Sequence, residues 1–119
     1  MVRKVVVLVM TFMAVLTAAP AMADSVPEQR VDQNVRIWRQ YTASGYRIWA
    51  EARYFAFWGH YDLWGPNLNA KDPAGEDTHW EVGEDTRPFG AWGSGWACAR
   101  GWAFYDGAYH SMGEACIPV

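Results

Sequence analysis

The stretch "WACARGWAFYDGAYHSMGEACIP" (residues 96–118) predicts a β-hairpin that a disulfide closes. At its centre, Asp106-Gly107 is a strong hairpin-turn signal, and the flanking segments "WAFY" and "AYHS" favour strands. A three-residue loop centred on Gly107 would place Cys98 directly opposite Cys116. The commoner two-residue loop would misalign the cysteines by one residue, so a β-bulge would be needed to pair them.

Two glycines are suited to hold such a bulge, and both loop lengths remain open. Gly101 precedes the turn and Gly113 follows it. Glycine readily adopts the backbone conformation that a bulge requires. With either loop we expect a cross-strand disulfide between Cys98 and Cys116.

Large and small side chains alternate along residues 96–105. A small-residue face would let another element pack close to the backbone, and Trp80 or Trp92 could supply it. We also expect Trp96 and Trp102 to pack in the core beside the disulfide. The large face consists of Trp96, Cys98, Arg100, Trp102 and Phe104, and the small face of Ala97, Ala99, Gly101, Ala103 and Tyr105.

The first 23 residues predict a cleaved signal peptide. Arg3 and Lys4 form a positive start, residues 5–16 are an apolar run, and "AMA" (residues 21–23) has the small-x-small pattern of a cleavage site. A membrane anchor is disfavoured because the apolar run is short and no stop-transfer charges follow it. We therefore expect a secreted, extracellular protein with no stable membrane insertion after cleavage.

The remaining residues predict an extended arm (residues 24–33) and one secreted β domain (residues 34–119). An oxidising exterior and an even cysteine count favour a disulfide over a reactive thiol or a zinc motif. After residue 23 the chain holds eight Arg and Lys against thirteen Asp and Glu. This acidic balance disfavours a nucleic-acid partner.

Strand signals dominate the domain. "IWAEARYFAF" (residues 48–57) contains good helix formers, but its aromatic and β-branched residues and its flanking turns favour a strand. With no helix to cover a sheet, the pattern predicts an all-β fold: a small antiparallel β-sandwich or partly closed barrel of about six strands. The expected strands are residues 34–41, 46–58, 60–64, 79–82 and the two arms of the cysteine hairpin.

The segments "NVRIWRQY" (residues 34–41) and "YRIWAEARYFAFW" (residues 46–58) predict a long hairpin around "TASG". A four-residue loop sets Trp38 opposite Trp49. One face of the hairpin then holds mostly core residues, and the other holds tryptophans together with charged side chains. The core face holds Val35, Ile37, Arg39, Tyr41, Tyr46, Ile48, Ala50, Ala52 and Tyr54, and the other holds Arg36, Trp38, Gln40, Arg47, Trp49, Glu51, Arg53 and Phe55.

The charged neighbours place this second face at least partly in water. The apolar face of a pyranose can lie on an indole ring while nearby polar side chains bind its hydroxyls. Trp38 and Trp49 would thus form a site for a glycan or cell-wall polymer, rimmed by Arg36, Gln40, Arg47 and Glu51. The alternative is an ordinary cross-strand pair that stiffens the hairpin.

Histidines and neighbouring acids are the candidates for catalysis or metal binding. His60 with Asp62, and His79 with Glu81, are i, i+2 pairs that share a strand face. Two such pairs on neighbouring strands could bind a metal or act as general acid and base. No catalytic motif supports this. We therefore expect a non-enzymatic protein without a metal or cofactor.

Two segments carry a resemblance to known proteins. "FWGHYDLWGPN" (residues 57–67) and "GSGWACARGW...YHSMGEACIPV" (residues 93–119) resemble small secreted Trp-rich proteins of Gram-positive, streptomycete-like bacteria, which implies no particular activity. Size and secretion are also similar to lactococcin-type bacteriocins. An alternative function is therefore a secreted interaction protein, either a protease inhibitor or a bacteriocin-like antibacterial toxin, that meets a protein partner through "EDTRPFGAWGSG" (residues 84–95).

Overall fold

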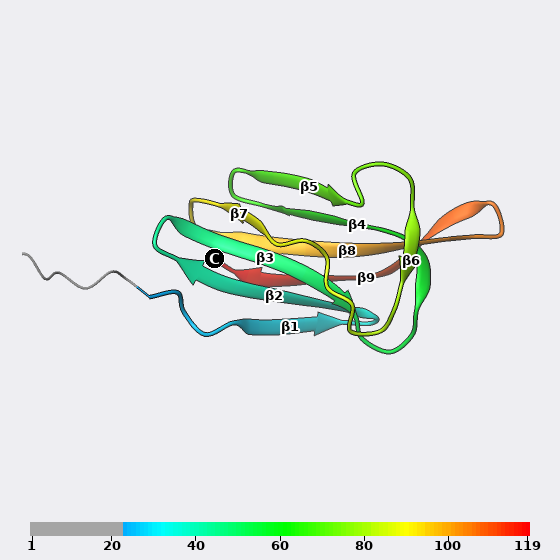
Figure 1. Ribbon diagram of the computed structural model, residues 1–119, viewed down its shortest axis with the longest axis horizontal. Helices are drawn as coiled ribbons and strands as arrows, with labels where there is room; N and C mark the ends of the chain where they lie inside the picture. Colours follow the sequence, from blue (N-terminus) through cyan, green and yellow to red (C-terminus); the bar gives the residue numbers. More distant parts are fainter. Residues whose placement is uncertain (1–22) are drawn as a thin grey trace, which may run out of the picture.

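Nine β-strands form two antiparallel sheets in the computed structural model, which describes residues 23–119 (Figure 1). The predicted all-β sandwich is confirmed, and it is not a closed barrel. The first sheet has the order β1 (Glu28–Asp32), β2 (Val35–Thr42), β3 (Gly45–Ala52) and β7 (Phe89–Ala91). The second has the order β5 (Leu68–Asp72), β4 (Phe57–Gly65), β8 (Trp96–Tyr105) and β9 (Ala108–Pro118), and β6 (Thr78–Trp80) pairs with β4.

Three short strands were absent from the sequence prediction. β1 lies within the predicted arm, where every one of its residues is exposed, and it pairs with β2 along the edge of the first sheet. β5 and β7 lie in segments that were not among the expected strands. Short edge strands like these bury little on either face, so they lack the apolar alternation that marks a strand in a sequence.

The predicted signal peptide (residues 1–23) lies outside the described residues apart from Ala23. Within residues 23–119, no helix is long and apolar enough to cross a membrane.

The β2–β3 hairpin has the predicted register, with Trp38 opposite Trp49 and Arg36 opposite Glu51. Most of its predicted core face is buried. Arg39 is also buried, and its guanidinium donates a hydrogen bond to the Pro118 carbonyl over 2.8 Å. Buried members of this face are Val35, Ile37, Tyr46, Ile48, Ala50 and Ala52, whereas Tyr41 and Tyr54 are exposed.

The chain leaves the first sheet earlier than predicted. β3 ends at Ala52, and residues 53–56 cross to the second sheet instead of continuing as a strand. The Asn34 side chain, itself buried, holds this crossing. Its Oδ1 accepts hydrogen bonds from the backbone N–H groups of Tyr54 and Phe55, and its Nδ2 donates to the Phe55 carbonyl. The amide side chain thus takes the place of a neighbouring strand, because it forms hydrogen bonds with the backbone N–H and C=O groups of the crossing segment.

The β8–β9 hairpin combines the two-residue loop with a bulge. Asp106 and Gly107 both have positive φ, as a type I′ turn requires. The register shifts between Gly101 and Trp102, and Gly113 on the opposite strand has a φ of 126°. This shift brings Cys98 opposite Cys116. The turn end of the hairpin projects beyond the other strands (Figure 1).

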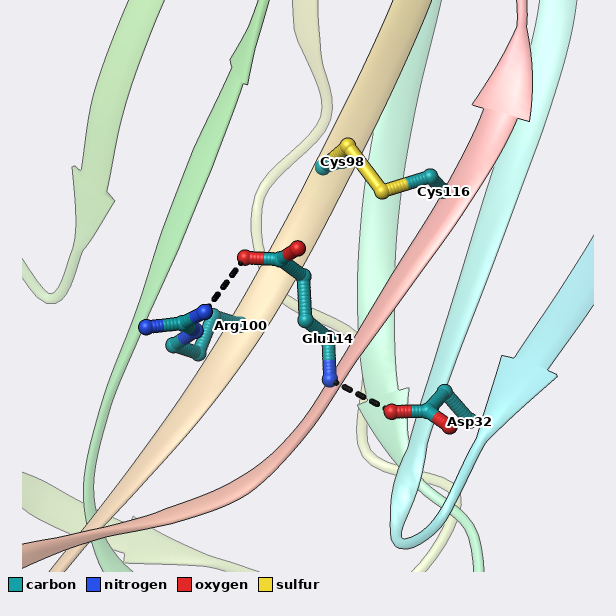
Figure 2. Close-up of a disulfide and its surroundings, with 5 residues drawn as sticks. All are labelled: Asp32, Cys98, Arg100, Glu114 and Cys116. Carbon is teal, nitrogen blue, oxygen red and sulfur yellow. Dashed lines mark hydrogen bonds and ion pairs between the residues drawn. A yellow bond between two sulfur atoms is a disulfide. The ribbon is translucent and has the colours of Figure 1, made fainter.

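The predicted Cys98–Cys116 disulfide is confirmed, with the two Cα atoms 4.0 Å apart. It shares the outer face of the second sheet with the ion pair of Arg100 and Glu114, whose side chains approach to 2.7 Å (Figure 2). Because the disulfide joins neighbouring strands of one sheet, it secures the register of β8 and β9 and does not link the two sheets.

The small-residue face of β8 packs toward the first sheet, as predicted. Ala97, Ala99 and Ala103 are buried there. At Gly101, an added Cβ would lie 3.1 Å from Cγ2 of Val35 and 3.4 Å from Cε1 of Tyr61. The sheets therefore approach too closely at this point to leave room for a larger side chain.

The predicted positions of four tryptophans are partly wrong. Trp80 is buried and donates a hydrogen bond from Nε1 to the Gly59 carbonyl. Trp92 and Trp96, in contrast, are 65% and 60% exposed. Trp96 and Trp102 lie on the outer face of β8, with Trp102 half-buried. The inward-facing positions of β8 hold small residues, and its large side chains lie on the opposite face because side chains alternate along a strand.

Replacing both Cys98 and Cys116 by alanine should lower the free energy of unfolding by about 3 kcal/mol, because the unfolded chain loses a crosslink. The far-UV circular dichroism spectrum should remain that of a β protein, since the sheets do not depend on the disulfide for contact. Urea denaturation measures the change. A loss below about 1 kcal/mol would contradict the assigned role.

Gly101→Leu should lower the free energy of unfolding by about 1–3 kcal/mol, because the side chain has no space beside Val35. Trp96→Leu on the exposed face of the same strand is the control and should change stability little. Thermal and urea denaturation of the two variants make the comparison. Equal stability of the two variants would show that the sheet spacing is not limiting.

Candidate functional site

The outer face of the first sheet carries the predicted indole pair, Trp38 and Trp49. The ring centroids lie 6.3 Å apart and the ring planes are within 11° of parallel. Both side chains are half-buried. Nε1 of Trp38 donates a hydrogen bond to Oε1 of Glu51 over 3.2 Å. The pair is therefore held in place on the sheet while part of its surface stays open to solvent.

The polar side chains predicted around the indole pair are already ordered by one another. Arg36 forms an ion pair with Glu51 at 2.7 Å, and Nε of Arg47 donates to Oε1 of Gln40 over 2.8 Å. Arg47 also pairs with Asp24, which precedes β1. These contacts fix the rim before any ligand arrives, which reduces the entropy that binding must remove.

The segment before β7 closes one side of the indole pair. Burial raises the pKa of Asp85, and hydrogen bonding to Glu51 and the charge of Glu51 raise it further. Thr86 is buried, and its Oγ1 accepts a hydrogen bond from the backbone N–H of Ala50. Asp85 thus reaches the rim from residues 84–95, a segment that was predicted to meet a protein partner and not to form part of this site.

Two hollows share the lining residues Arg47 and Pro88, and one of them lies beside the indole pair. The smaller has a volume of about 200 Å³ and reaches Trp49. The larger, of about 640 Å³, extends past the β2–β3 turn to Trp92. Because they share lining residues, the two hollows are neighbours, and together, from Trp49 to Trp92, they are called the groove here.

The two predicted histidine–acid pairs do not converge on one site. Nε2 of His79 lies 3.0 Å from Oε1 of Glu81, in an exposed pair. His60 lies 3.9 Å from Asp62. Within residues 23–119, no group of three or more His, Cys, Asp or Glu side chains is arranged to hold a metal ion. The possible shared metal site that the i, i+2 spacing suggested is therefore not formed.

His60 instead forms a cluster with Asp77 and Tyr109, two residues that were not predicted to lie beside it. Its Nδ1 lies 2.8 Å from Oδ1 of Asp77, which precedes β6. The hydroxyl of Tyr109 donates to Oδ2 of the same carboxylate over 2.6 Å. Burial opposes ionisation of Asp77, but the hydrogen bonds from Tyr109 and His60 outweigh it and lower its pKa.

This cluster lies on the outer face of the second sheet, where further polar contacts connect β4 with β8. Nε1 of Trp102 donates to Oδ2 of Asp62 over 3.0 Å. The Arg100 guanidinium lies 5.2 Å from the centroid of the Trp102 ring, a cation–π distance. The pairing of β4 with β8 creates the contact between Trp102 and Asp62, which are 40 positions apart in sequence, whereas Arg100 and Trp102 both lie on β8.

Comparisons with protein-family models, with curated proteins and with solved structures gave no match for this chain. The resemblance to small secreted Trp-rich proteins stays a prediction.

Acid should destabilise the protein through Asp77. A carboxyl whose pKa is lowered by folding contributes stability that is complete above its ordinary pKa and is lost as the pH falls through the folded value. The loss should therefore begin below about pH 4. Asp77→Asn should weaken this pH dependence, which urea denaturation between pH 7 and pH 3 measures. An identical pH profile in wild type and variant would contradict the assignment.

Proposed function

We propose that this protein is a secreted, non-enzymatic binding module that holds a saccharide polymer on the outer face of its first sheet. The observation that carries the proposal is the indole pair: Trp38 and Trp49 lie within 11° of parallel on a half-exposed face. The Cys98–Cys116 disulfide is compatible with the oxidising exterior in which such a polymer is found.

The chemistry of this face suits a sugar. The C–H face of a pyranose is apolar and can lie against an indole, whereas its hydroxyls need donors and acceptors at the ring edge. Arg36 and Arg47 supply donors, and Gln40 supplies both a donor and an acceptor. A purely apolar ligand would remove water from these groups without offering them a further hydrogen bond, and would therefore bind poorly.

The groove favours a polymer over a single sugar. It extends from Trp49 past Arg47 to Trp92, an indole that is exposed to solvent. A chain of sugar units that lies along this groove would contact Trp92 as well as the indole pair. Each additional contact raises the affinity without a further loss of rigid-body entropy.

The arrangement of residues 84–95 weighs against a protease inhibitor. An inhibitory loop presents a free extended segment, but here Thr86 is buried and the Arg87 N–H donates to Oδ2 of Asp72. Phe89–Ala91 then pairs with β3 as a strand. The segment is thus integrated into the first sheet, where it forms one wall of the groove.

Replacing Trp38 and Trp49 together by alanine should raise the apparent Kd for an insoluble saccharide polymer by at least about tenfold, because the apolar contact area is lost. Co-sedimentation with chitin, cellulose and purified peptidoglycan measures the retained fraction. Trp96→Ala is the matched control, since it removes an exposed indole from the other sheet.

Circular dichroism and urea denaturation should show that the double variant keeps its fold, with a loss of about 1 kcal/mol for the cross-strand contact. Unchanged retention on every polymer would mean that the indole pair only stiffens the hairpin. The proposal would then fail, as it would if wild-type protein bound none of the three polymers.

A further inference from the structure

We propose that the outer face of the second sheet carries a second saccharide-binding site, the cleft between Trp58, Phe104 and Tyr109, and that the protein is therefore bivalent. For its ligand class this inference rests on the proposed function of the first sheet. The two sites lie on opposite outer faces of the sandwich, because they belong to different sheets.

The cleft, called here the Trp58 cleft, has a volume of about 350 Å³. Three aromatic side chains at its wall are open to solvent: Trp58 is 53% exposed, Tyr109 48% and Phe104 42%. They come from β4 and from the two arms of the β8–β9 hairpin. The remaining wall is the segment between β5 and β6, together with the end of β5, which contributes Lys71, Gly75, Glu76 and Asp77.

The Tyr109 ring is fixed although it is exposed. Its hydroxyl donates to Asp77, and Asp77 in turn contacts His60, which is only 8% exposed. The ring also makes edge contacts with His60 and Phe104, at centroid distances of 5.1 and 5.0 Å. A largely buried Asp77–His60 pair thus orients an aromatic side chain at the surface. Such preorganisation lowers the entropy lost on binding and is expected of a binding site.

The charges in the wall select the class of ligand. An apolar protein surface or a lipid surface would remove water from Lys71 and Glu76 without replacing their hydrogen bonds. A quaternary ammonium ion would be attracted by the aromatic rings, but it has no donor or acceptor with which to form hydrogen bonds to Lys71 and Glu76. A sugar ring uses both features, because its C–H face contacts Trp58 or Tyr109 and its hydroxyls bind the charged groups.

Two sites on opposite faces have a consequence for polymer binding. Adjacent strands of an insoluble polysaccharide can be held by one protein molecule, and the second binding event then occurs at a high effective concentration. The protein would connect saccharide chains to one another in addition to attaching itself to them.

Isothermal titration of the purified protein with chitohexaose and cellohexaose tests the inference. Wild type and the control Trp96→Ala should bind two equivalents of at least one hexasaccharide, and Trp58→Ala one equivalent. The double variant of Trp38 and Trp49 to alanine should also bind one equivalent. Trp58 is half-exposed, so its replacement leaves no cavity in the core, and circular dichroism verifies the fold.

The possible results separate this inference from the proposed function. If Trp58→Ala still binds as wild type does, the inference is overturned and the first site stands. If only Trp58→Ala loses binding, the Trp58 cleft is a saccharide site and the indole pair is not. Failure of wild type to bind either hexasaccharide overturns the inference.

A second variant, at Tyr109, tests the effect of the orientation of the aromatic ring while the ring itself is kept. Tyr109→Phe keeps the aromatic surface but removes the hydrogen bond to Asp77. It should weaken binding at the Trp58 cleft about fivefold, as expected for one lost orienting hydrogen bond.

Titrations with choline chloride and with phosphatidylcholine vesicles test whether the cleft binds a different class of ligand. Binding of either that requires Trp58 would overturn the assignment to a saccharide.

Discussion

The close approach of the two sheets at the small-residue face of β8 determines much of this structure. An added Cβ at Gly101 would lie 3.1 Å from Val35, so this position has little room for any side chain, and the other inward-facing positions between Ala97 and Ala103 hold alanine. The large side chains of β8 must therefore point outward. Trp96, Trp102 and Phe104 are on the surface for this reason. The packing requirement of the core thus produces an aromatic outer face on the second sheet.

Both outer faces combine aromatic rings with paired charges. On the first sheet, Glu51 accepts hydrogen bonds from both Arg36 and Trp38, so the rim and the rings are ordered together. On the second, Asp77 serves the same purpose for His60 and Tyr109. In each case a largely buried carboxylate holds a more exposed aromatic or cationic group. Surfaces ordered in this way suit ligands that have an apolar face and polar edges.

The features that were predicted correctly are those encoded by neighbouring residues within one hairpin. The β2–β3 register and the Cys98–Cys116 pair follow from alternation and from turn residues within a single hairpin. The end of β3 was predicted wrongly because aromatic residues continue beyond Ala52, whereas the chain actually turns where Asn34 binds the backbone of Tyr54 and Phe55. Asn34 is twenty residues away, so no local pattern reveals this contact.

By itself, the sequence determined the all-β class, the two long hairpins, the disulfide and the pairing of Trp38 with Trp49. Each depends on the period-2 alternation of a strand or on the chemistry of its turn. Only the tertiary structure decided that Trp96 is exposed, that His60 and His79 contact different carboxylates, and that Asp77 meets His60 and Tyr109. These contacts join segments from separate hairpins and loops. Their formation depends on how the sheets pack, which no single segment of the chain encodes.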